Sequence, residues 1–166
     1  MILEGQARVF GDDVNTDYII SSRRKRETID ETQLRAFLFE GIDPSFAASV
    51  QPGDIIVGGR NFGCGSAMEV AVTVIQAAGI QAVVAQSFAR SFYRNAMNNG
   101  LVVVECDTSS IVEGDGLVVS LDADVRVRVS TREIELRCAP IPPLMLRILA
   151  SGGLVTFLRD GGEFSP

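Results

Sequence analysis

Histidine is absent from this 166-residue sequence, and cysteine occurs only three times. The lack of histidine removes the commonest general base and the commonest metal ligand of proteins. The three cysteines, Cys64, Cys106 and Cys138, are widely spaced and form no C-x-x-C pair, which is typical of reduced cytosolic thiols. They offer neither a disulfide framework nor a zinc site. We therefore expect this chain to bind no metal, and its chemistry to use other groups or those of a partner.

Long apolar runs are also missing, since none approaches the ~20 residues that a membrane span needs. The first residues, Met1 to Glu4, lack the basic and apolar regions of a signal peptide, so we expect a cytoplasmic protein without a membrane partner. The formal net charge is −6, whereas nucleic-acid binding depends on net or clustered positive charge. One run, Arg23-Arg24-Lys25-Arg26, is cationic, but against this acidic background we expect no nucleic-acid partner.

What is present is an ordinary globular composition, 46% hydrophobic and 22% charged, in a chain long enough for one core. We therefore expect a single domain over residues 1–166. Three apolar strands alternate with two helical segments in the middle of the chain, at residues 55–57, 66–78, 82–85, 89–98 and 101–104. This order predicts a parallel βαβαβ core with right-handed crossovers.

The flanking segments complete a prediction of the α/β class. Before the core we expect two short strands, a polar loop and a helix with Asp30 as its N-cap, at residues 2–10, 16–20, 21–30 and 30–40. After the core, alternating apolar residues predict an antiparallel layer of three strands covering one side, followed by a closing helix, at residues 117–121, 125–129, 134–137 and 142–150.

A glycine-rich segment, Gly63-Cys64-Gly65-Ser66, follows the first core strand and opens the first core helix. Ser66 and Glu69 have the S-x-x-E spacing of a capping box, in which each side chain binds a free backbone N–H of the helix start. The glycines let the backbone turn sharply and approach a ligand, and a helix N-terminus favours an anion or a serine alkoxide. The alternative is that Ser66 is only an N-cap and the glycines only a turn.

Two nucleotide-binding signatures fit this segment less well. Gly59 to Gly65 does not give G-x-G-x-x-G in register, and no acidic ribose partner follows near residues 81–86. A Walker loop would need a Gly-Lys-Ser/Thr sequence, which is missing here. We therefore do not assign a nucleotide site.

Several longer motifs occur in order along nearly the whole chain: Asn15-Thr16-Asp17, then residues 52–57, 60–66, 87–95 and 150–154. Together they resemble the small subunit of 3-isopropylmalate dehydratase. The same pattern is similar to homoaconitase small subunits and to the swivelling C-terminal domain of aconitase.

This resemblance implies a swivelling β/β/α domain that closes over a [4Fe-4S] cluster held by cysteines of a separate large subunit. The family reaction dehydrates a hydroxy acid and rehydrates the alkene with the hydroxyl moved, so this chain would be inactive alone. By the same resemblance, Ser66 is the alkoxide that removes a proton from carbon, and the partner's iron polarises the substrate hydroxyl. Asp17 would orient a catalytic group of the large subunit, although by structure alone it could be no more than a turn residue.

The chain departs from its family directly after Ser66. The family continues Ser-Arg, where this sequence has Ala67-Met68, and a thioether cannot imitate the bidentate grip of arginine on a substrate carboxylate. An arginine of residues 23–26, or of the large subunit, could hold the carboxylate instead. Alternatively, Gly65, Ala67 and Met68 contact a substrate with an apolar group at this place. Met68 could also simply face the core.

The cationic run lies where related small subunits carry their substrate-specificity loop. Among Arg23, Arg24 and Arg26 we expect one to grip a carboxylate, with Arg26 closest to an arginine of homoaconitase-like loops, whereas the usual role of such a run is a solvated face. Three hypotheses remain open. The chain is a small subunit of the isopropylmalate or homoaconitate group, a paralogue for alkyl- or aryl-substituted malates, or a non-catalytic regulatory module.

Overall fold

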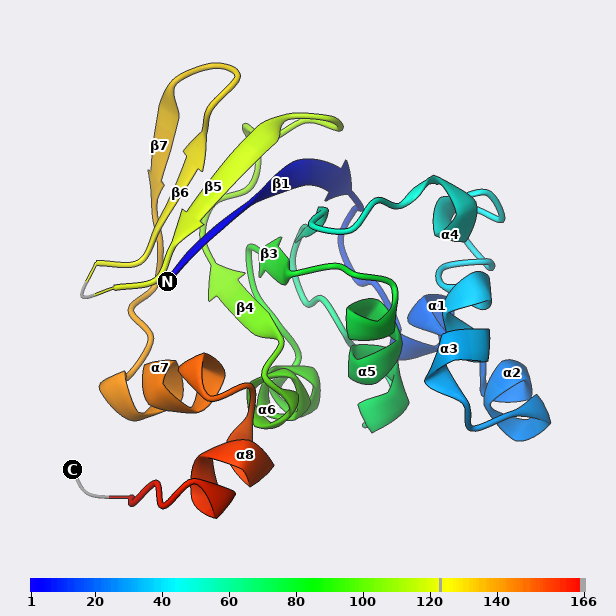
Figure 1. Cartoon of the computed structure of the whole chain (residues 1–166). Coiled ribbons are helices and arrows are strands. Elements are labelled where there is room, and N and C mark those ends of the chain that lie inside the picture. Colours follow the sequence, from blue (N-terminus) through cyan, green and yellow to red (C-terminus); the bar gives the residue numbers. More distant parts are fainter. Residues whose placement is uncertain (123, 165–166) are drawn as a thin grey trace.

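Seven strands form one mixed sheet in the order β4-β3-β2-β1-β5-β6-β7 (Figure 1). The computed structural model describes residues 1–122 and 124–164. The strands are β1 (Ile2–Val9), β2 (Ile55–Gly58), β3 (Ala82–Ala85), β4 (Val102–Glu105), β5 (Gly116–Ser120), β6 (Arg126–Val129) and β7 (Ile134–Arg137). The first four pair in parallel and the last three are antiparallel. The predicted α/β class, with its parallel core and antiparallel part, is confirmed.

Strand β1 joins the two parts of the sheet. Its second half, Ala7–Val9, runs parallel to β2, and its first half, Ile2–Gln6, runs antiparallel to β5. The antiparallel strands therefore continue the sheet from β1 instead of lying as a separate layer on one side of it. An alternating apolar pattern predicts that a strand has one buried face, but it does not predict which edge the strand will pair with.

Helices α5 (Glu69–Ala77) and α6 (Arg90–Asn99) connect the parallel strands, as the βαβαβ pattern predicts, and pack against each other. The closing helix α7 (Pro143–Ala150) is also confirmed, and it is followed by α8 (Leu154–Arg159), which the sequence did not indicate. Both α7 and α8 pack against α6 (Figure 1). Strands β2, β3 and β4 are buried over most of their length because helices and neighbouring strands enclose them.

The segment between β1 and β2 differs from the prediction. Residues 16–20, predicted as a strand, form helix α1 (Thr16–Ile19), and the predicted loop contains helix α2 (Ser22–Glu27). Both helices are too short to show an apolar period, and each begins at a side-chain cap, from Asn15 and Ser21.

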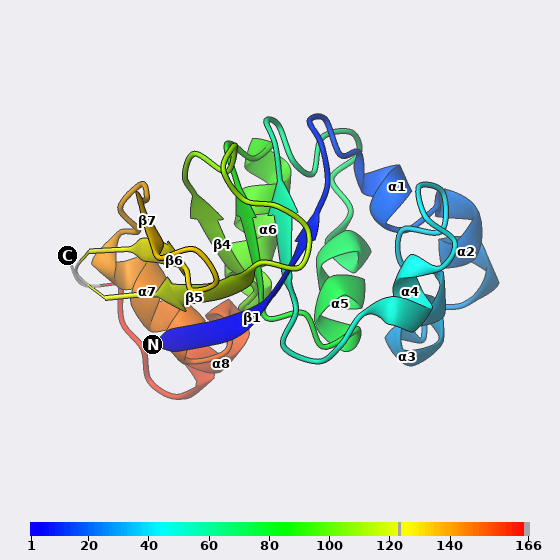
Figure 2. The same ribbon diagram turned by 90° about the horizontal axis from the view of Figure 1, so that it is seen from above.

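The predicted N-cap Asp30 does accept from the Thr32 amide, but its helix is short. It consists of α3 (Glu31–Leu34) followed by the 3-10 helix η1 (Arg35–Phe37), and α4 (Phe46–Ser49) comes next. Helices α1 to α4 gather at the end of the molecule opposite β5, β6 and β7 (Figure 2).

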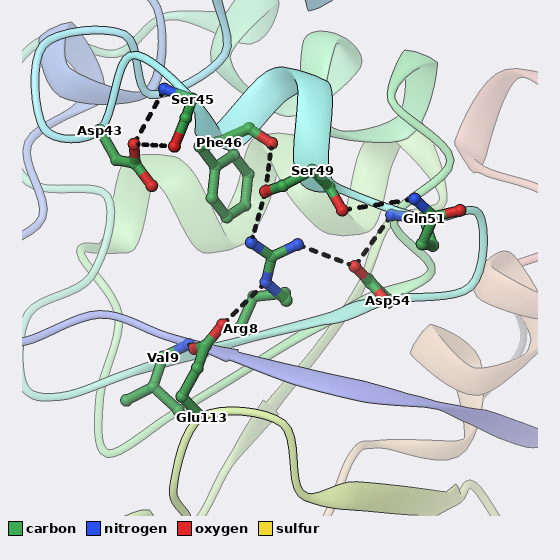
Figure 3. Close-up of polar contacts among 9 residues, drawn as sticks. All are labelled: Arg8, Val9, Asp43, Ser45, Phe46, Ser49, Gln51, Asp54 and Glu113. Atoms are coloured by element: carbon green, nitrogen blue, oxygen red, sulfur yellow. Dashed lines mark hydrogen bonds and ion pairs between the residues drawn. The ribbon is translucent and has the colours of Figure 1, made fainter.

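A network of ion pairs and hydrogen bonds around Arg8 of β1 links helix α4 to the sheet (Figure 3). The Arg8 guanidinium binds Asp54 at 3.1 Å and Glu113 at 2.9 Å, and it donates to the Ser49 hydroxyl at 2.7 Å. It also lies 4.7 Å from the centre of the Phe46 ring. Asp54 is only 4% exposed, so the Arg8 charge is the partner that makes its burial tolerable.

A second buried carboxylate, Asp115, precedes β5 and predicts a pH dependence of stability. Hydrogen bonding from Arg132 lowers the pKa of Asp115 from 3.8 to about 2, against the opposing effect of burial, and the Val112 amide and Thr131 hydroxyl lower it further. Because the folded-state pKa is depressed, the stabilisation is complete above pH 4 and is lost as the pH falls towards 2.

We expect the urea midpoint of the wild type to fall between pH 4 and pH 2, when it is followed by circular dichroism. The Asp115→Asn variant should start lower at pH 6 and lose less over the acid range, so that the two curves converge. Parallel curves would show that Asp115 does not contribute to the acid sensitivity.

Candidate active site in the glycine-rich loop

The loop at residues 59–68 is held in place on two sides. On one side the Gly63 amide donates to the Val14 carbonyl, and the Thr16 amide donates to the Cys64 carbonyl, both at 2.8 Å. On the other side the Phe62 amide donates to the Ser87 carbonyl at 2.9 Å. The early Thr-Asp motif, the glycine-rich loop and the segment before α6, which are far apart in sequence, are therefore adjacent in the fold.

Two glycines make this close approach possible. Gly63 has φ +78°, and a Cβ there would lie 2.2 Å from a ring carbon of Phe92. Gly65 has φ +91°, and a Cβ there would lie 2.4 Å from the side-chain oxygen of Asn15. Both positions combine a left-handed backbone with a space that only hydrogen fits, so neither accepts another residue without moving the loop.

Ser66 is exposed but does not cap α5. The helix begins at Glu69 with Met68 as its N-cap residue, and no side chain makes a capping hydrogen bond there, so the predicted capping box is wrong. Tertiary contacts set the helix start: the Thr16 hydroxyl donates to the Ser66 carbonyl at 2.8 Å, and Met68 is extended with its side chain in the core. The helix N-terminus that we expected at Ser66 therefore lies three residues later, at Glu69.

The loop itself offers other donors. Within the described residues, the amides of Gly65, Ser66 and Ala67 and the Ser66 hydroxyl make no hydrogen bond to the protein. Successive free amides next to a left-handed residue form a concave site that favours an anion. Ser66 thus lies among backbone donors that can stabilise negative charge, although its hydroxyl donates to no acceptor among residues 1–122 and 124–164.

Asp17 lies on α1, one residue after Thr16, which binds the Ser66 carbonyl. Its carboxylate is exposed and accepts from the Ser22 hydroxyl at 2.6 Å, and its amide donates to the Asn15 side chain. Asp17 and Ser66 are therefore on adjoining segments. Ser22 connects Asp17 to the start of α2, a contact that the sequence did not indicate.

The arginines of α2 differ in what they bind. Arg24 forms a bidentate pair with Glu40, at 2.9 Å for both contacts, and also binds Glu27 and lies over the Phe37 ring. These carboxylates raise the pKa of Arg24 and leave its guanidinium fully engaged. Arg23 is 3.5 Å from Glu27 and largely exposed. Arg26 is exposed and forms no ion pair with any residue that the structure describes.

A hollow of about 400 Å³ lies between the α2 region and α5, with Lys25, Glu69 and Val70 among its walls. Lys25 is thus the member of the cationic run that lines this hollow beside α5. No sequence pattern distinguishes it from its neighbours. Met68 is 6% exposed and belongs to the core, which favours the structural alternative considered for it over contact with a substrate. Ala67 and Gly65 are exposed beside Ser66.

Cys64, in the loop, is half-buried, and burial together with the nearby Asp13 carboxylate raises the pKa of its thiol.

Over residues 1–122 and 124–164, no three histidine, cysteine, aspartate or glutamate side chains come together to hold a metal ion. The described part of the chain also contains no helix that is long and apolar enough to cross a membrane.

The sequence profile of the Aconitase C-terminal domain family matches residues 22–109, which include the glycine-rich loop and most of the parallel core. This defines the class of domain. The 3-isopropylmalate dehydratase small subunit 2 of Archaeoglobus fulgidus is 45% identical, over 98% of both chains. The methanogen homoaconitase small subunit of Methanocaldococcus jannaschii is 44% identical, over 96% of this chain and 92% of its own.

A crystal structure of 3-isopropylmalate dehydratase from Methanocaldococcus jannaschii is similar at a TM-score of 0.91 and 44% identity, covering 96% of this chain and 95% of that chain. The chain belongs to the 3-isopropylmalate dehydratase small-subunit family of aconitase-type hydro-lyases. The family and fold that the sequence motifs implied are confirmed.

Proposed function

We propose that this chain is the small subunit of a heteromeric hydro-lyase that dehydrates and rehydrates a hydroxy di- or tricarboxylic acid. The observation that carries the proposal is the loop that presents Ser66, exposed and surrounded by free amides, next to the Asp17 segment. The small-subunit relatives support a large partner subunit, which we propose holds the [4Fe-4S] cluster, because the described residues of this chain form no metal site. We place the complex in the cytoplasm.

In this mechanism Ser66 removes the proton from the substrate carbon. A serine hydroxyl is a weak base, so it must lose its proton and the resulting anion must be stabilised. Because no described residue accepts a hydrogen bond from this hydroxyl, we propose that the partner subunit provides the proton acceptor. The amides of Gly65 and Ala67 supply part of that stabilisation. Asp17, held by Ser22, orients a catalytic group of the partner. The chain alone therefore has an incomplete site.

The substrate carboxylate needs a cation from elsewhere. At the position where the family has an arginine, this chain has Met68, and the Met68 side chain is buried. We propose Arg26 for this role, because Arg24 is engaged by Glu40 and Glu27 and Arg23 lies near Glu27. Relatives of nearly equal identity have different names, isopropylmalate dehydratase and homoaconitase, so overall similarity does not select the substrate. An alkyl- or aryl-substituted malate is a second candidate substrate, because the small Ala67 side chain beside Ser66 leaves room for an apolar group.

A substrate panel in the reconstituted complex tests this assignment. The panel consists of an isopropyl-substituted malate, a tricarboxylic acid of the homoaconitate class and an aryl-substituted malate. We expect Arg26→Ala to lower kcat/KM for the preferred acid by about 10- to 100-fold, mostly through KM, because a charge-assisted contact is lost. Arg23→Ala, the matched control on the same helix, should change it less than about threefold. Equal losses in both variants would mean that α2 contributes only general positive charge.

A further inference from the structure

Cys106 and Cys138 are far apart in the sequence but lie opposite each other where the two edge strands of the sheet meet. Cys106 follows β4 and Cys138 follows β7, and these are the two outermost strands of the sheet. An antiparallel bridge pairs the two cysteines. The sheet therefore curls until its edges touch at this point, a contact that cysteine spacing in the sequence does not predict.

The backbone geometry of this bridge suits a disulfide. The Ala139 amide donates to the Glu105 carbonyl at 2.7 Å, so the hydrogen bond joins the residue before Cys106 to the residue after Cys138. The cysteines are then a non-hydrogen-bonded pair, the type in which Cα atoms lie about 4.5 Å apart with side chains close together on one face. Disulfides need Cα separations of about 4.4–6.8 Å, so the strands can be bridged without rearranging.

The surroundings give the two thiols different roles. Cys106 is 8% exposed and belongs to the core, whereas Cys138 is half-buried and lines a hollow of about 300 Å³ together with Arg126 and Arg137. A hydrogen bond from the Cys106 thiol lowers the pKa of Cys138, while the same contact and burial raise the pKa of Cys106. Cys138 is thus the sulfur that ionises more readily and that a small solute can reach.

We propose that Cys106 and Cys138 are a redox-active pair, a modification site at which a peroxide converts two thiols into a disulfide that fastens β4 to β7. The Cys138 thiolate attacks one peroxide oxygen, the O–O bond breaks, and a sulfenic acid and water are formed. The Cys106 sulfur then attacks the sulfenic sulfur, the S–O bond breaks, and a second water leaves with the remaining proton. The two thiols lose two electrons and hydrogen peroxide gains them, giving one disulfide and two waters.

The bond would close a loop that contains all three antiparallel strands, β5, β6 and β7. Such a cross-link restricts the unfolded chain, so the oxidised protein should resist unfolding better than the reduced one. This property does not depend on Ser66 or on the partner subunit. The disulfide would join the ends of β4 and β7, and strands β5, β6 and β7 lie at the end of the molecule opposite α1 to α4 (Figure 2).

The test treats the full chain with stoichiometric hydrogen peroxide and maps peptides by mass spectrometry without reduction. We expect a peptide joined through Cys106 and Cys138 and lighter by two hydrogens, formed before Cys64 is oxidised and reversed by dithiothreitol. Cys64→Ser, the matched control, should form the same cross-link. Cys106→Ser should instead accumulate a sulfenic acid on Cys138 that a dimedone probe traps.

Stability provides a readout that does not rely on the variants folding well. The oxidised wild type should show a higher urea midpoint than the reduced wild type, and dithiothreitol should abolish the difference. Preferential oxidation of Cys64, a cross-link that involves Cys64, or full oxidation without the Cys106–Cys138 peptide would each overturn the proposal.

Discussion

Replacing Ser66 with alanine is expected to lower kcat of the reconstituted enzyme by about 10²–10⁴-fold, the range that a general base contributes. The Ser66 hydroxyl makes no hydrogen bond to any described residue, so removing it should not disturb the fold. KM should change little, because the loop amides and the α2 cations that would hold the substrate stay in place. Initial rates over a range of substrate concentration, with the urea midpoint of the variant, measure both effects.

Ser109→Ala is a suitable control for this experiment, since Ser109 is an exposed serine in the loop between β4 and β5. Its activity should match that of the wild type. A Ser66→Ala complex with unchanged kcat would mean that Ser66 is structural, and would favour the view of this chain as a regulatory module. A loss in KM alone would place the hydroxyl in substrate binding and not in proton transfer.

Replacing Arg8 with methionine is expected to lower the free energy of unfolding by about 3 kcal/mol, because it leaves the buried Asp54 carboxylate without its cation. The methionine keeps most of the apolar stem, so the effect is mainly electrostatic. Urea unfolding at pH 7, followed by circular dichroism, measures the change. The Ser49 and Glu113 contacts of Arg8 would be lost at the same time (Figure 3).

Two further variants identify the source of this loss. Arg126→Met breaks an exposed pair with Glu135 and should cost less than about 1 kcal/mol. Combining Arg8→Met with Asp54→Asn removes the unpaired charge and should recover part of the stability. If Arg8→Met costs no more than Arg126→Met, then Asp54 is not stabilised by the guanidinium and the network does not hold the helical end to the sheet.

The parallel core could be predicted because its signals are local. Strands β2, β3 and β4 each contain an uninterrupted apolar run, and α5 and α6 end close to a glycine. The apolar pattern and the helix-ending glycines are therefore sufficient to predict these elements. Helices α1 and α2 were missed because they are short and depend on caps from Asn15 and Ser21. An apolar count over so few residues cannot separate a helix from a strand.

The candidate site was located from the sequence, but its local structure was not. The S-x-x-E spacing predicted that Ser66 begins the helix, whereas Thr16, about fifty residues earlier, and the buried Met68 place the start at Glu69. The ion pair of Arg24 also depends on a residue distant in sequence, Glu40. The sequence alone therefore could not predict which arginines of the cationic run form structural ion pairs. Contacts between segments decided each of these points.

We propose that this chain supplies the Ser66 loop to a site that the large subunit completes. The most direct measurement titrates the purified chain into a fixed amount of the iron–sulfur large subunit and follows alkene formation from the preferred hydroxy acid. We predict no turnover by either subunit alone, a rise in activity with added chain, and saturation at a fixed ratio. Robust turnover by this chain without the large subunit would show that its site is complete by itself and would overturn the proposal.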